Sequence, residues 1–436
     1  MADYISAIPP VNYPYAKIVF GPLTDDPFSV STDAVDNRPK YFISLSHERI
    51  INKAATISFT LSFAPHNTME FEDADALEMM ISSKMGLCTI EYGWTINDTN
   101  KYWVMLTTYT ITFNNGVITY TFKGITQSAL FNDSLIHIMY DTTTGNVSDF
   151  LEYLKKQIEY YTNKRYTLNI SKCTRNFKLP DYEIDISDYS VMGVLNTLVN
   201  SFLGLDEDTT NKYLCVIVDD KITNDTDSNV SEIYIKLCDV YKDEVNAHYS
   251  FAWNDPNGGV IDFNVTYDGA VAMNMVRADA SNSENFNYKT SVIMSNGAPQ
   301  TITTKGLATS KDKYMLSELS QINHIENYSK YYWAQKSNYP YDATLTVLGN
   351  TDASVEITDK IHVDVLLGLT KHHTSGTYFV TKIIDTISSS GFTTQYSMKK
   401  IEADSDAFAT LHRSKGNILE YAITNDGKYT HHAIKD

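Results

Sequence analysis

The sequence predicts a mainly β protein in which two similar small β-barrels flank an α+β region. Three observations lead to this fold class. Alternating apolar and polar residues, the pattern of half-buried strands, run through residues 15–130 and 336–402. Two amphipathic helical patterns and several short strands occupy the part between them. The two β-rich parts, finally, repeat each other in sequence.

We divide the 436 residues into six segments. They are an N-terminal arm (1–14), a first barrel (15–130), an α+β middle domain (131–260), a connecting segment (261–335), a second barrel (336–402) and a polar C-terminal tail (403–436). The connecting segment should contain a strand, a long exposed loop over 279–315 and a helix that leads into the second barrel. Its loop is rich in Ser, Asn, Thr, Lys and Gly and shows weak periodicity.

The first β-rich part contains a strong hairpin signal. In the run ATISFTLSF the apolar residues alternate, and ADALEMMISSKMG (74–86) is typical of a short helix. Further on, two alternating runs flank Asn114-Asn115-Gly116. Asn-Gly between such runs is the most reliable short-range indication of a β-hairpin.

The middle part changes character. In SDFLEYLKKQIEYY, Leu151, Leu154 and Ile158 share one helix face, and Ser148 is placed to cap its start. A second amphipathic helix, SDYSVMGVLNTLVNSFLG, should end at Gly204. The runs YTLNI, YLCVIVDD and SEIYIKLCDV read as strands.

The second β-rich part repeats the first. Residues 102–125 align without a gap on residues 378–401, and seven of the 24 positions are identical, among them Tyr102/Tyr378, Thr110/Thr386 and Tyr120/Tyr396. The turn falls in nearly the same place, Asn115-Gly116 against Ser390-Gly391, and similar strands precede both hairpins. Shared β composition could produce such a match, but the common order of strands favours one barrel built twice.

Duplication suggests a mode of assembly. If three such chains close around an axis, their six quasi-equivalent barrels form a ring, since head-to-tail contacts usually close cyclically. Such a ring can meet a six-fold partner on one face and a three-fold partner on the other. The hairpin residues expected to form the ring are Tyr102, Val104, Thr110, Asn115, Gly116 and Tyr120 in the first barrel, and Tyr378, Val380, Thr386, Gly391 and Tyr396 in the second. A proline at Thr110 or Thr386 should break a central ladder and prevent ring assembly.

Composition excludes some classes of protein. The net charge of -18 argues against nucleic-acid binding as the main task, because phosphate contacts need clustered Lys and Arg. No apolar run is long enough to span a membrane, and the acidic, proline-broken N-terminus does not resemble a secretory signal. The cysteines Cys88, Cys173, Cys215 and Cys238 form no C-x-x-C pair and are expected to be small buried side chains.

No catalytic or cofactor motif is present in the sequence. It lacks G-x-S-x-G, H-E-x-x-H and P-loop patterns, so we expect neither an enzyme nor a cofactor. The pairs His372-His373 and His431-His432 would be poor metal chelates, because adjacent residues in a strand point to opposite faces. Acidic runs near 206–210 and 225–229 lack the spacing of a calcium loop, which leaves no expected metal site.

The second barrel carries a family resemblance. The stretches Ala343–Gly349, Ile361–Val365, Gly376–Val380 and Thr393–Lys400 resemble the baseplate hub proteins of contractile-tailed phages and related injection machines. The first barrel and the helix over 188–203 follow the same plan more loosely, so the resemblance covers about residues 15–402. Two residues depart from it. Asp385 stands where relatives often carry His, and Thr358 stands where a glycine is common before the last barrel strand.

The resemblance implies a fold and a role. It implies tail-tube-like barrels and a homotrimeric symmetry adapter that joins the six-fold tail tube to the three-fold central spike. It also implies a place in the tail baseplate of a virion, around the channel for DNA and the tape-measure protein, and contacts with baseplate wedge proteins. Two alternatives remain open. The 31 tyrosines would suit a tail-tip carbohydrate or receptor binder, and a cleft with two close carboxylates would indicate a glycan or peptidoglycan hydrolase.

Overall fold

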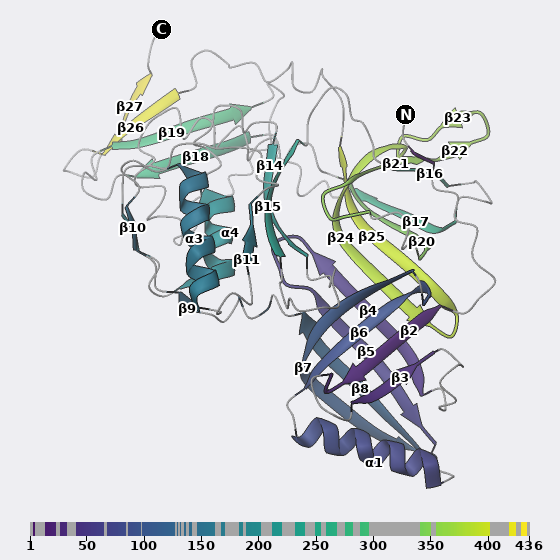
Figure 1. Cartoon of the computed structure of the whole chain (residues 1–436). Coiled ribbons are helices and arrows are strands. Elements are labelled where there is room, and N and C mark those ends of the chain that lie inside the picture. The colour runs from purple at the N-terminus through teal and green to yellow at the C-terminus, as the bar shows by residue number, and fades with distance from the viewer. Residues whose placement is uncertain are drawn as a thin grey trace.

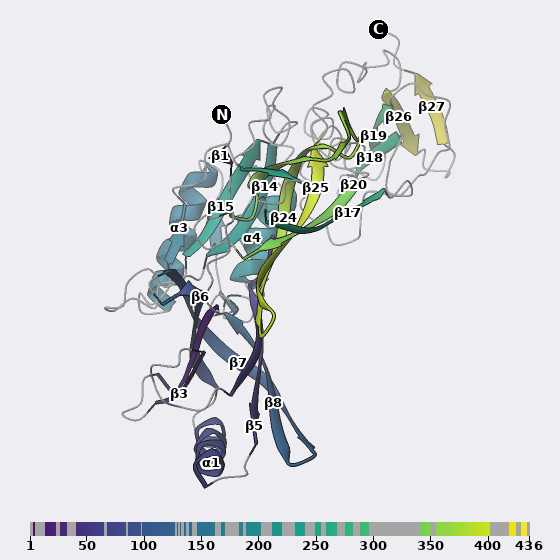
Figure 2. The ribbon, with the colours of Figure 1, turned by 90° about the vertical axis from the view of Figure 1, so that its right-hand side faces the viewer.

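The computed structural model describes part of the chain in detail. The described residues are 3–4, 14–22, 27–32, 41–64, 68–83, 86–96, 98–126, 129, 131, 135–136, 139–141, 146–161, 167–170, 183–185, 189–201, 212–219, 232–239, 249–253, 259–267, 275–281, 288–295, 341–349, 355–401, 418–423 and 429–433. Figure 1 shows two β-rich parts, one below the other, with the helices α3 and α4 beside the upper part. Figure 2 shows the same parts after a quarter turn, with α1 at the lower end in both views.

The lower part, which we call the first unit, is an antiparallel sheet with one helix. Its strands are β2 (Tyr15–Phe20), β3 (Phe28–Ser31), β4 (Phe42–Ile50), β5 (Thr56–Phe63), β6 (Leu87–Thr95), β7 (Asp98–Asn114) and β8 (Val117–Thr126), and its helix is α1 (Thr68–Ser83). Their order is β4-β5-β8-β7-β6-β2-β3. Asn115 and Gly116 between β7 and β8 both have positive φ, as a type I′ hairpin requires, so the predicted hairpin is confirmed.

The second unit has its own strand order. Its strands are β16 (Tyr249–Ala252), β17 (Val260–Tyr267), β20 (Tyr341–Leu348), β21 (Lys360–Asp364), β24 (Gly376–Ser388) and β25 (Gly391–Ile401). They lie in the order β16-β21-β24-β25-β20-β17, and β1 (Asp3–Tyr4) pairs with β16. The short strands β22 (Leu366–Leu367) and β23 (Thr370–Lys371) form a separate pair. Thus β16 and β17, which lie before residue 268 in the chain, pair with strands from residue 341 onward.

The two units have the same strand order. In chain sequence, β2, β4, β5, β6, β7 and β8 correspond to β16, β17, β20, β21, β24 and β25, and each set pairs in the same spatial order. Only the outermost pair differs, because β2 runs antiparallel to β6 whereas β16 runs parallel to β21. The internal repeat inferred from the sequence is therefore a repeat of topology.

Two β-bulges occur at equivalent places in both units, and they determine which residues of the two units correspond. One lies at Thr107 in β7 and at Thr381 in β24, and each hydroxyl donates to a backbone carbonyl across the hairpin, Thr107 to Lys123 at 3.1 Å and Thr381 to Ser397 at 3.0 Å. The other lies at Ile43 in β4 and at Ile261 in β17. Bulges are specific local features, so their recurrence supports a true duplication.

The residue pairs matched by the bulges differ by two positions from the pairs matched by the sequence alignment. The sequence alignment matches Thr110 with Thr386, whereas the bulges and turns match Asn114 with Ser388 and hence Thr112 with Thr386. Because side chains alternate with a period of two, a shift of two keeps every residue on its own face of the sheet. The apolar pattern therefore aligned well even though the exact partners were displaced.

Neither unit closes into a barrel, which corrects the expectation of two separate small barrels. Within the described residues the strands of both units belong to a single 14-stranded sheet, joined where β24 pairs with β4. The cause lies at Thr381. Before this bulge β24 pairs with β21, and beyond it residues 382–388 pair with β4 instead. The hairpin β24–β25 thereby leaves its own unit and extends the sheet of the other.

The middle region is α+β, as predicted. It contains α3 (Val147–Tyr161), α4 (Val191–Ser201), β9 (Leu135–Ile136), β10 (Met139–Asp141), β11 (Thr167–Asn169), β12 (Glu183–Asp185), β13 (Tyr189–Ser190), β14 (Lys212–Asp219) and β15 (Glu232–Asp239). The capping residue of α3 differs from the prediction. Asn146 precedes the helix and its N–H donates to Asp149 at 3.1 Å, whereas Ser148 lies inside the first turn.

Asn52 connects this region to the first unit. Its backbone N–H donates to the Val216 carbonyl at 3.0 Å, and its side-chain oxygen accepts from the Val216 N–H at 2.9 Å. Asn52 has a φ of 61°, a conformation that asparagine tolerates better than most residues. A single turn residue therefore pins β14 to the end of β4.

A four-stranded sheet replaces parts of the predicted loop and tail. Its strands are β18 (Met275–Ser281), β19 (Tyr288–Ser295), β26 (Ile418–Ile423) and β27 (Tyr429–Ala433). β19 falls within the predicted loop 279–315, and β26 and β27 fall within the predicted tail, so these segments are strands. β19 and β26 pair with each other across more than 120 residues, which periodicity does not reveal. The predicted helix near 317–336 and Gly204 lie outside the described residues.

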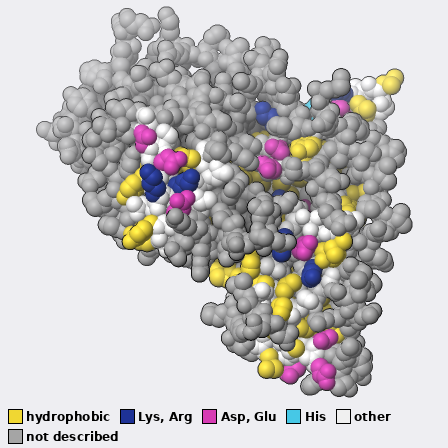
Figure 3. All heavy atoms as spheres, viewed as in Figure 1, with side chains coloured by type: hydrophobic (Ala, Val, Ile, Leu, Met, Phe, Trp, Pro, Cys, Tyr) yellow, Lys and Arg dark blue, Asp and Glu magenta, His cyan; other side chains and the backbone are white. Residues whose placement is uncertain are grey.

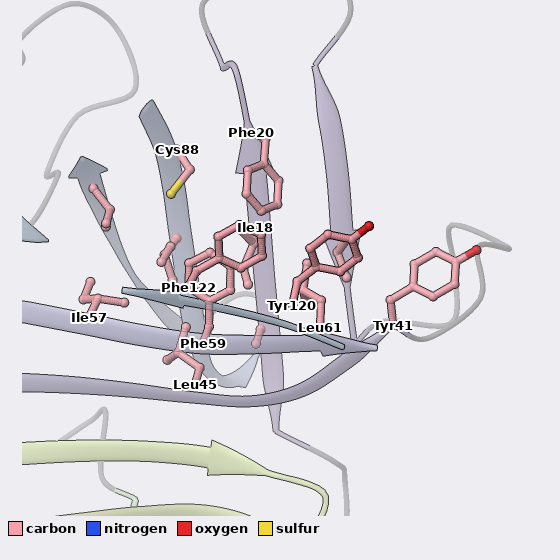
Figure 4. Close-up of a cluster of buried hydrophobic side chains, with 14 of the residues drawn as sticks. Ile18, Phe20, Tyr41, Leu45, Ile57, Phe59, Leu61, Cys88, Tyr120 and Phe122 are labelled. Atoms are coloured by element: carbon pink, nitrogen blue, oxygen red, sulfur yellow. The ribbon is translucent and has the colours of Figure 1, made fainter. Parts of the chain in front are cut away.

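The first core is aromatic. Figure 4 shows residues of this core gathered between several strands, Ile18, Phe20, Leu45, Ile57, Phe59, Leu61, Cys88, Tyr120 and Phe122, with Tyr41 at its margin. Phe59 and Phe122 stack with ring centroids 4.8 Å apart. Cys88 and Cys215 are buried, as expected, and burial raises the pKa of the Cys88 thiol. In the described part of the chain no helix is long and apolar enough to cross a membrane.

Candidate assembly surface

Eight strands form one continuous wall across both units. They lie in the order β17-β20-β25-β24-β4-β5-β8-β7, and every neighbouring pair is antiparallel. We call this the wall. Its two end strands, β17 and β7, lie on opposite sides of the molecule, as Figure 1 shows. The wall is the largest structure that the duplicated units build together.

One face of the wall carries mainly hydroxyl side chains. Residues on this face alternate with the buried core residues and therefore point the other way. The hydroxyl residues are Thr108, Thr110 and Thr112 on β7, Thr119 and Thr121 on β8, Thr56, Ser58, Thr60 and Ser62 on β5, Ser44 and Ser46 on β4, Thr386 and Ser388 on β24, Thr393 and Ser397 on β25, Thr344 and Thr346 on β20, and Thr266 on β17. Several stand directly opposite one another, such as Thr60 and Thr121.

The charges on this hydroxyl face balance. Lys382 pairs with Glu48 at 2.7 Å, and Lys399 lies 3.8 Å from Asp342. Lys101, Lys123 and Asp262 are the further charged residues in the same alternation, and Lys101 lies opposite Glu91 of the neighbouring strand β6. Exposed pairs of this kind contribute little stability, but they leave the face without a strong field of either sign. The face is therefore polar and close to neutral, in a chain whose net charge is -18.

Acidic residues gather elsewhere, on α1. Figure 3 shows acidic side chains at the lower end of the molecule, where α1 lies. Two of them hold the helix on the sheet. Tyr41 donates its hydroxyl hydrogen to Asp73 at 2.6 Å, and Tyr120 donates to Glu78 at 2.5 Å. Burial and this carboxylate together raise the pKa of Tyr120. The acidic residues of α1 thus lie at one end of the first unit, away from the wall's hydroxyl face.

A buried polar cluster joins the units where β24 meets β4. Asp385 accepts three hydrogen bonds, from Arg49 at 2.7 Å, from the Tyr92 hydroxyl at 2.9 Å and from Thr394 at 2.7 Å. His47, directly opposite Asp385 in the ladder, lies 2.8 Å from the Tyr92 hydroxyl through its Nδ1. Four strands contribute to this cluster: β4, β6, β24 and β25.

The hydrogen-bond directions determine the tautomer of His47. The Tyr92 hydroxyl gives its only hydrogen to Asp385, so it must accept the hydrogen of His47 Nδ1. His47 Nε2 then carries a lone pair, and it is buried without a hydrogen-bond partner. Burial, reinforced by the positive charge of Arg49, holds the pKa of His47 well below its ordinary value. His47 is therefore neutral and hydrogen-bonded at one nitrogen.

Charge compensation dominates the rest of the cluster. Burial, the largest single effect, lowers the pKa of Arg49, but attraction to Asp385 together with smaller contributions from Tyr102, Tyr92 and Tyr396 raises the pKa above its ordinary value. Burial, followed by the negative charge of Asp385, raises the pKa of Tyr92 well above its ordinary value. Among the described residues, Asp385 is thus the carboxylate that compensates the largely buried charge of Arg49 at this joint.

Apolar residues complete the joint. Ile387 and Phe392, near the tip of the β24–β25 hairpin, are part of the core of the first unit. Phe392 meets the rings of Tyr92 and Trp94, and Trp94 donates its indole N–H to the Gly349 carbonyl. Gly349 has no room for a side chain, since a Cβ there would come within 2.4 Å of the Phe392 ring. One unit therefore completes its core with the hairpin tip of the other.

The residues singled out in the sequence occupy several different places. Tyr102, Val104 and Tyr120 lie in the first core, and Tyr378, Val380 and Tyr396 lie in the second. Asn115 and Gly116 form the first turn, and Gly391 begins β25 directly after the second turn. Thr386 lies between β4 and β25, whereas Thr110 pairs only with β8 among the described residues. Among the described residues Thr110 thus has a strand on one side only, and a central ladder at this residue stays a prediction for the assembled ring.

Sequence reasoning missed most of the polar cluster. One residue in the sequence indicated this cluster: Asp385 is an acidic residue at a position where the baseplate hub family often has His. His47, Arg49 and Tyr92 are ordinary residues of alternating strands, and nothing in their spacing places them beside Asp385. Ladder pairing between β4 and β24, more than 300 residues apart, brings them together.

No metal site is found among the described residues, where no group of three or more His, Cys, Asp and Glu is placed to hold an ion. His372 and His373 follow β23 in a turn, so their rings lie 4.1 Å apart and do not point to opposite faces as a strand would require. His431 and His432 lie in β27. The acidic runs near 206–210 and 225–229 lie outside the described residues.

The fold has known counterparts among tail proteins. The tail protein from Neisseria meningitidis MC58 superposes with a TM-score of 0.57 over 90% of this chain and 98% of its own, at 10% sequence identity. The 43 kDa tail protein of prophage MuSo2 from Shewanella oneidensis superposes with a TM-score of 0.50 over 89% of this chain and 99% of its own, at 12% identity. No family model and no curated protein matches the sequence.

These similarities define the fold of the chain. It is the fold of phage tail proteins, and it extends over nearly the whole length of both counterparts. The β-rich fold that the sequence resemblance implied is therefore confirmed, whereas the two closed barrels that it also implied are replaced by one open sheet. Sequence identities near 10% explain why no family model detects the similarity.

Proposed function

We propose that this chain is a structural hub of a phage tail or tail-like injection machine, built into the baseplate of the particle. It acts as a homotrimeric adapter between a six-fold tail tube and a three-fold central spike. The observation that carries the proposal is the duplication of the β-rich unit, which occurs twice in the wall. Each chain contributes two units with the same strand order, so three chains present six similar units around an axis.

Symmetry explains why a duplicated chain suits this task. A six-fold partner requires six similar docking surfaces, which three double units supply. A three-fold partner requires features that occur once per chain, and within the described residues the middle region and α1 occur once. Head-to-tail contacts that close on themselves produce such rings. The tube partner therefore docks on the repeated units, and the spike docks on the unrepeated ones.

The hydroxyl face suits the lining of a channel. A passing polyanion binds strongly to clustered Lys and Arg. The wall carries balanced charges and many hydroxyl groups, and its ion pairs leave no free basic cluster. DNA or the tape-measure protein can pass such a surface without being retained. Wedge proteins of the baseplate, in this arrangement, contact the outer surface.

The fold also bears on the alternatives. Its counterparts are tail proteins, which supports a structural role over hydrolysis of glycans or peptidoglycan. The second alternative, a carbohydrate or receptor binder, needs exposed aromatic residues gathered in a groove. Exposed tyrosines are found at the end of α3 and on the end strands of the wall, far apart in the chain. The structural hub remains the function that the geometry supports best.

Light scattering behind size exclusion, over a wide range of protein concentration, tests the proposal. We expect a mass of three chains, about 148 kDa from the 49.2 kDa monomer, reached reversibly as concentration rises. Neither a sugar binder nor a hydrolase predicts that number. A monomer at the highest concentration, also in the presence of the cognate spike protein, would contradict the trimeric hub.

A further inference from the structure

The internal joint between the two units is a template for a joint between copies. Residues 382–388 of β24, beyond the bulge at Thr381, pair with residues 44–50 of β4. The corresponding segments of the other units are residues 108–114 of β7, beyond the bulge at Thr107, and residues 262–267 of β17. In the described part of the chain each of these two segments has a strand on one side only.

Burial marks both segments as edges that lack their neighbour. Ile387 of β24 is 1% exposed, whereas the corresponding Phe113 of β7 is 73% exposed. Tyr109, which corresponds to the buried Ile383, is 48% exposed, and Tyr267 at the end of β17 is 59% exposed. The same position in the duplicated fold is thus covered at the internal joint and open at the ends of the wall.

The edge of β7 lacks the usual protection against pairing. Proteins guard exposed edge strands with charged residues, proline or short length. Residues 107–114 read TTYTITFN, without a charge or a proline, in a strand of 17 residues. On β17, residues 263–267 read FNVTY and are uncharged, whereas Asp262 at the start of the segment carries a charge and follows the bulge at Ile261. Over these stretches both edges are apolar on alternate residues, as strands that acquire a partner are.

Transferring the internal register predicts which residues would meet. Ile387 lies opposite Leu45, so Phe113 would lie opposite Phe263. Asp385 lies opposite His47, so Ile111 would lie opposite Val265. By the same rule, Tyr109 would face Tyr267. Every core-facing pair is aromatic or aliphatic, where the internal joint has its buried polar cluster, and aromatic and β-branched pairs are favourable across strands.

We propose that the β7 edge of one copy pairs with the β17 edge of the next, antiparallel and in the register of the internal joint, so that Thr112 lies opposite Asn264 and Thr110 opposite Thr266. Internal and external joints then alternate around a ring. The number of copies in the ring rests on the proposed hub function, whereas the identity and register of the two edges rest on the duplicated strands alone.

Disulfide trapping tests the register. The full chain carrying Thr112→Cys with Asn264→Cys, or Thr110→Cys with Thr266→Cys, is oxidised and run without reductant. β7 and β17 lie at opposite ends of the wall, so any bridge must join two copies. We expect covalent dimers and trimers from both matched pairs. The mismatched pair Thr108→Cys with Asn264→Cys, displaced by four residues or roughly 13 Å along the strand, should give none.

A second variant tests the edge without a cross-link. Phe113→Asp places a charge in the proposed joint and should raise the concentration needed for half-association at least tenfold. Tyr160→Asp, at a comparably exposed aromatic residue on α3, is the matched control and should leave that concentration unchanged. Phe113 is exposed in the single chain, so the melting temperature of the monomer should not fall.

The outcomes separate the inference from the proposed function. If the chain forms trimers but neither matched pair of cysteines cross-links, the proposed joint is wrong and the trimeric hub still stands. Matched cross-links in a ladder that continues beyond three chains would support the joint and contradict the trimer. Cross-links from the mismatched pair, or from Thr112→Cys alone as a β7·β7 contact, would overturn the register. Equal effects of Phe113→Asp and Tyr160→Asp on association would overturn the edge.

Discussion

Asp385 of β24 lies opposite His47 of β4, and the two residues hold the same Tyr92 hydroxyl between them. The hydroxyl donates to Asp385 at 2.9 Å and lies 2.8 Å from His47 Nδ1. These residues come from the two halves of a duplicated chain, so their contact exists only because the units share one sheet. The cluster makes the internal joint specific, because its hydrogen bonds are satisfied in one register only.

Asp385→Asn should destabilise the protein by about 2–3 kcal/mol, because it leaves Arg49 without its charge partner. The loss should be below the ~3–5 kcal/mol of fully buried pairs, since a quarter of the Arg49 side chain reaches solvent. Urea denaturation measures the change. Asp342→Asn, which removes an exposed partner of Lys399, is the control and should cost less than about 0.5 kcal/mol. Equal losses from both variants would show that the cluster carries no special stability.

The stability should fall as the pH drops below the ordinary pKa of histidine. The pKa of His47 is lowered in the folded protein, so the unfolded chain binds the proton more readily. Stability is then full above about pH 6.5 and decreases below it, by at most about 1.4 kcal/mol per pH unit. His47→Asn keeps a donor near the Tyr92 hydroxyl but does not titrate, and it should flatten the pH profile between 7 and 5. An unchanged slope in the variant would assign the effect to other residues.

Thr358→Gly should stabilise the protein by about 1 kcal/mol. Thr358 has a φ of 81°, a region that a β-branched residue occupies only under strain, and its buried hydroxyl lacks a hydrogen-bond partner. Glycine removes both penalties. Asn115→Gly is the control, because Asn115 also has a positive φ but tolerates it, and it should change stability by less than about 0.5 kcal/mol. Thermal melting compares the two, and a lower melting temperature for Thr358→Gly would disprove the strain.

Proline should be tolerated differently at the two threonines that the sequence alignment paired. Thr386 has strands on both sides, so Thr386→Pro must break a ladder and lower the urea midpoint strongly. Thr110 has one neighbouring strand among the described residues, so Thr110→Pro should cost less stability in the monomer. The urea midpoints of the two variants, measured at a protein concentration too low for the chains to associate, test this difference. Equal midpoints would mean that Thr110 is as central as Thr386.

Local pattern predicted the strands well, because each unit buries one face of its sheet. Ile57, Phe59, Leu61 and Phe63 alternate in the sequence and are all buried. The hairpin at Asn115-Gly116 followed from turn chemistry in the same way. Even Thr358 was visible as a residue standing where glycine is common, and its positive φ supplies the physical reason.

Long-range pairing was beyond the sequence. β17 lies in a segment that the sequence assigned to a connection, yet it pairs with β20, more than 70 residues later. β19 and β26 likewise pair across a wide separation, so a loop and a tail by composition contain strands. Periodicity reports which face of a strand is apolar, and it carries no information about which strand lies beside it.

The sequence by itself determined the class of fold, the duplication and the hairpins, because these depend on alternation, turn residues and recurrence along the chain. Only the tertiary structure decided that the units merge into one open sheet instead of two barrels. The bulge at Thr381 turns β24 from β21 to β4, and the ladder then brings Asp385 to His47 and Arg49. A one-residue bulge leaves no clear mark in the hydrophobic pattern, yet it redirects a strand and selects its neighbour.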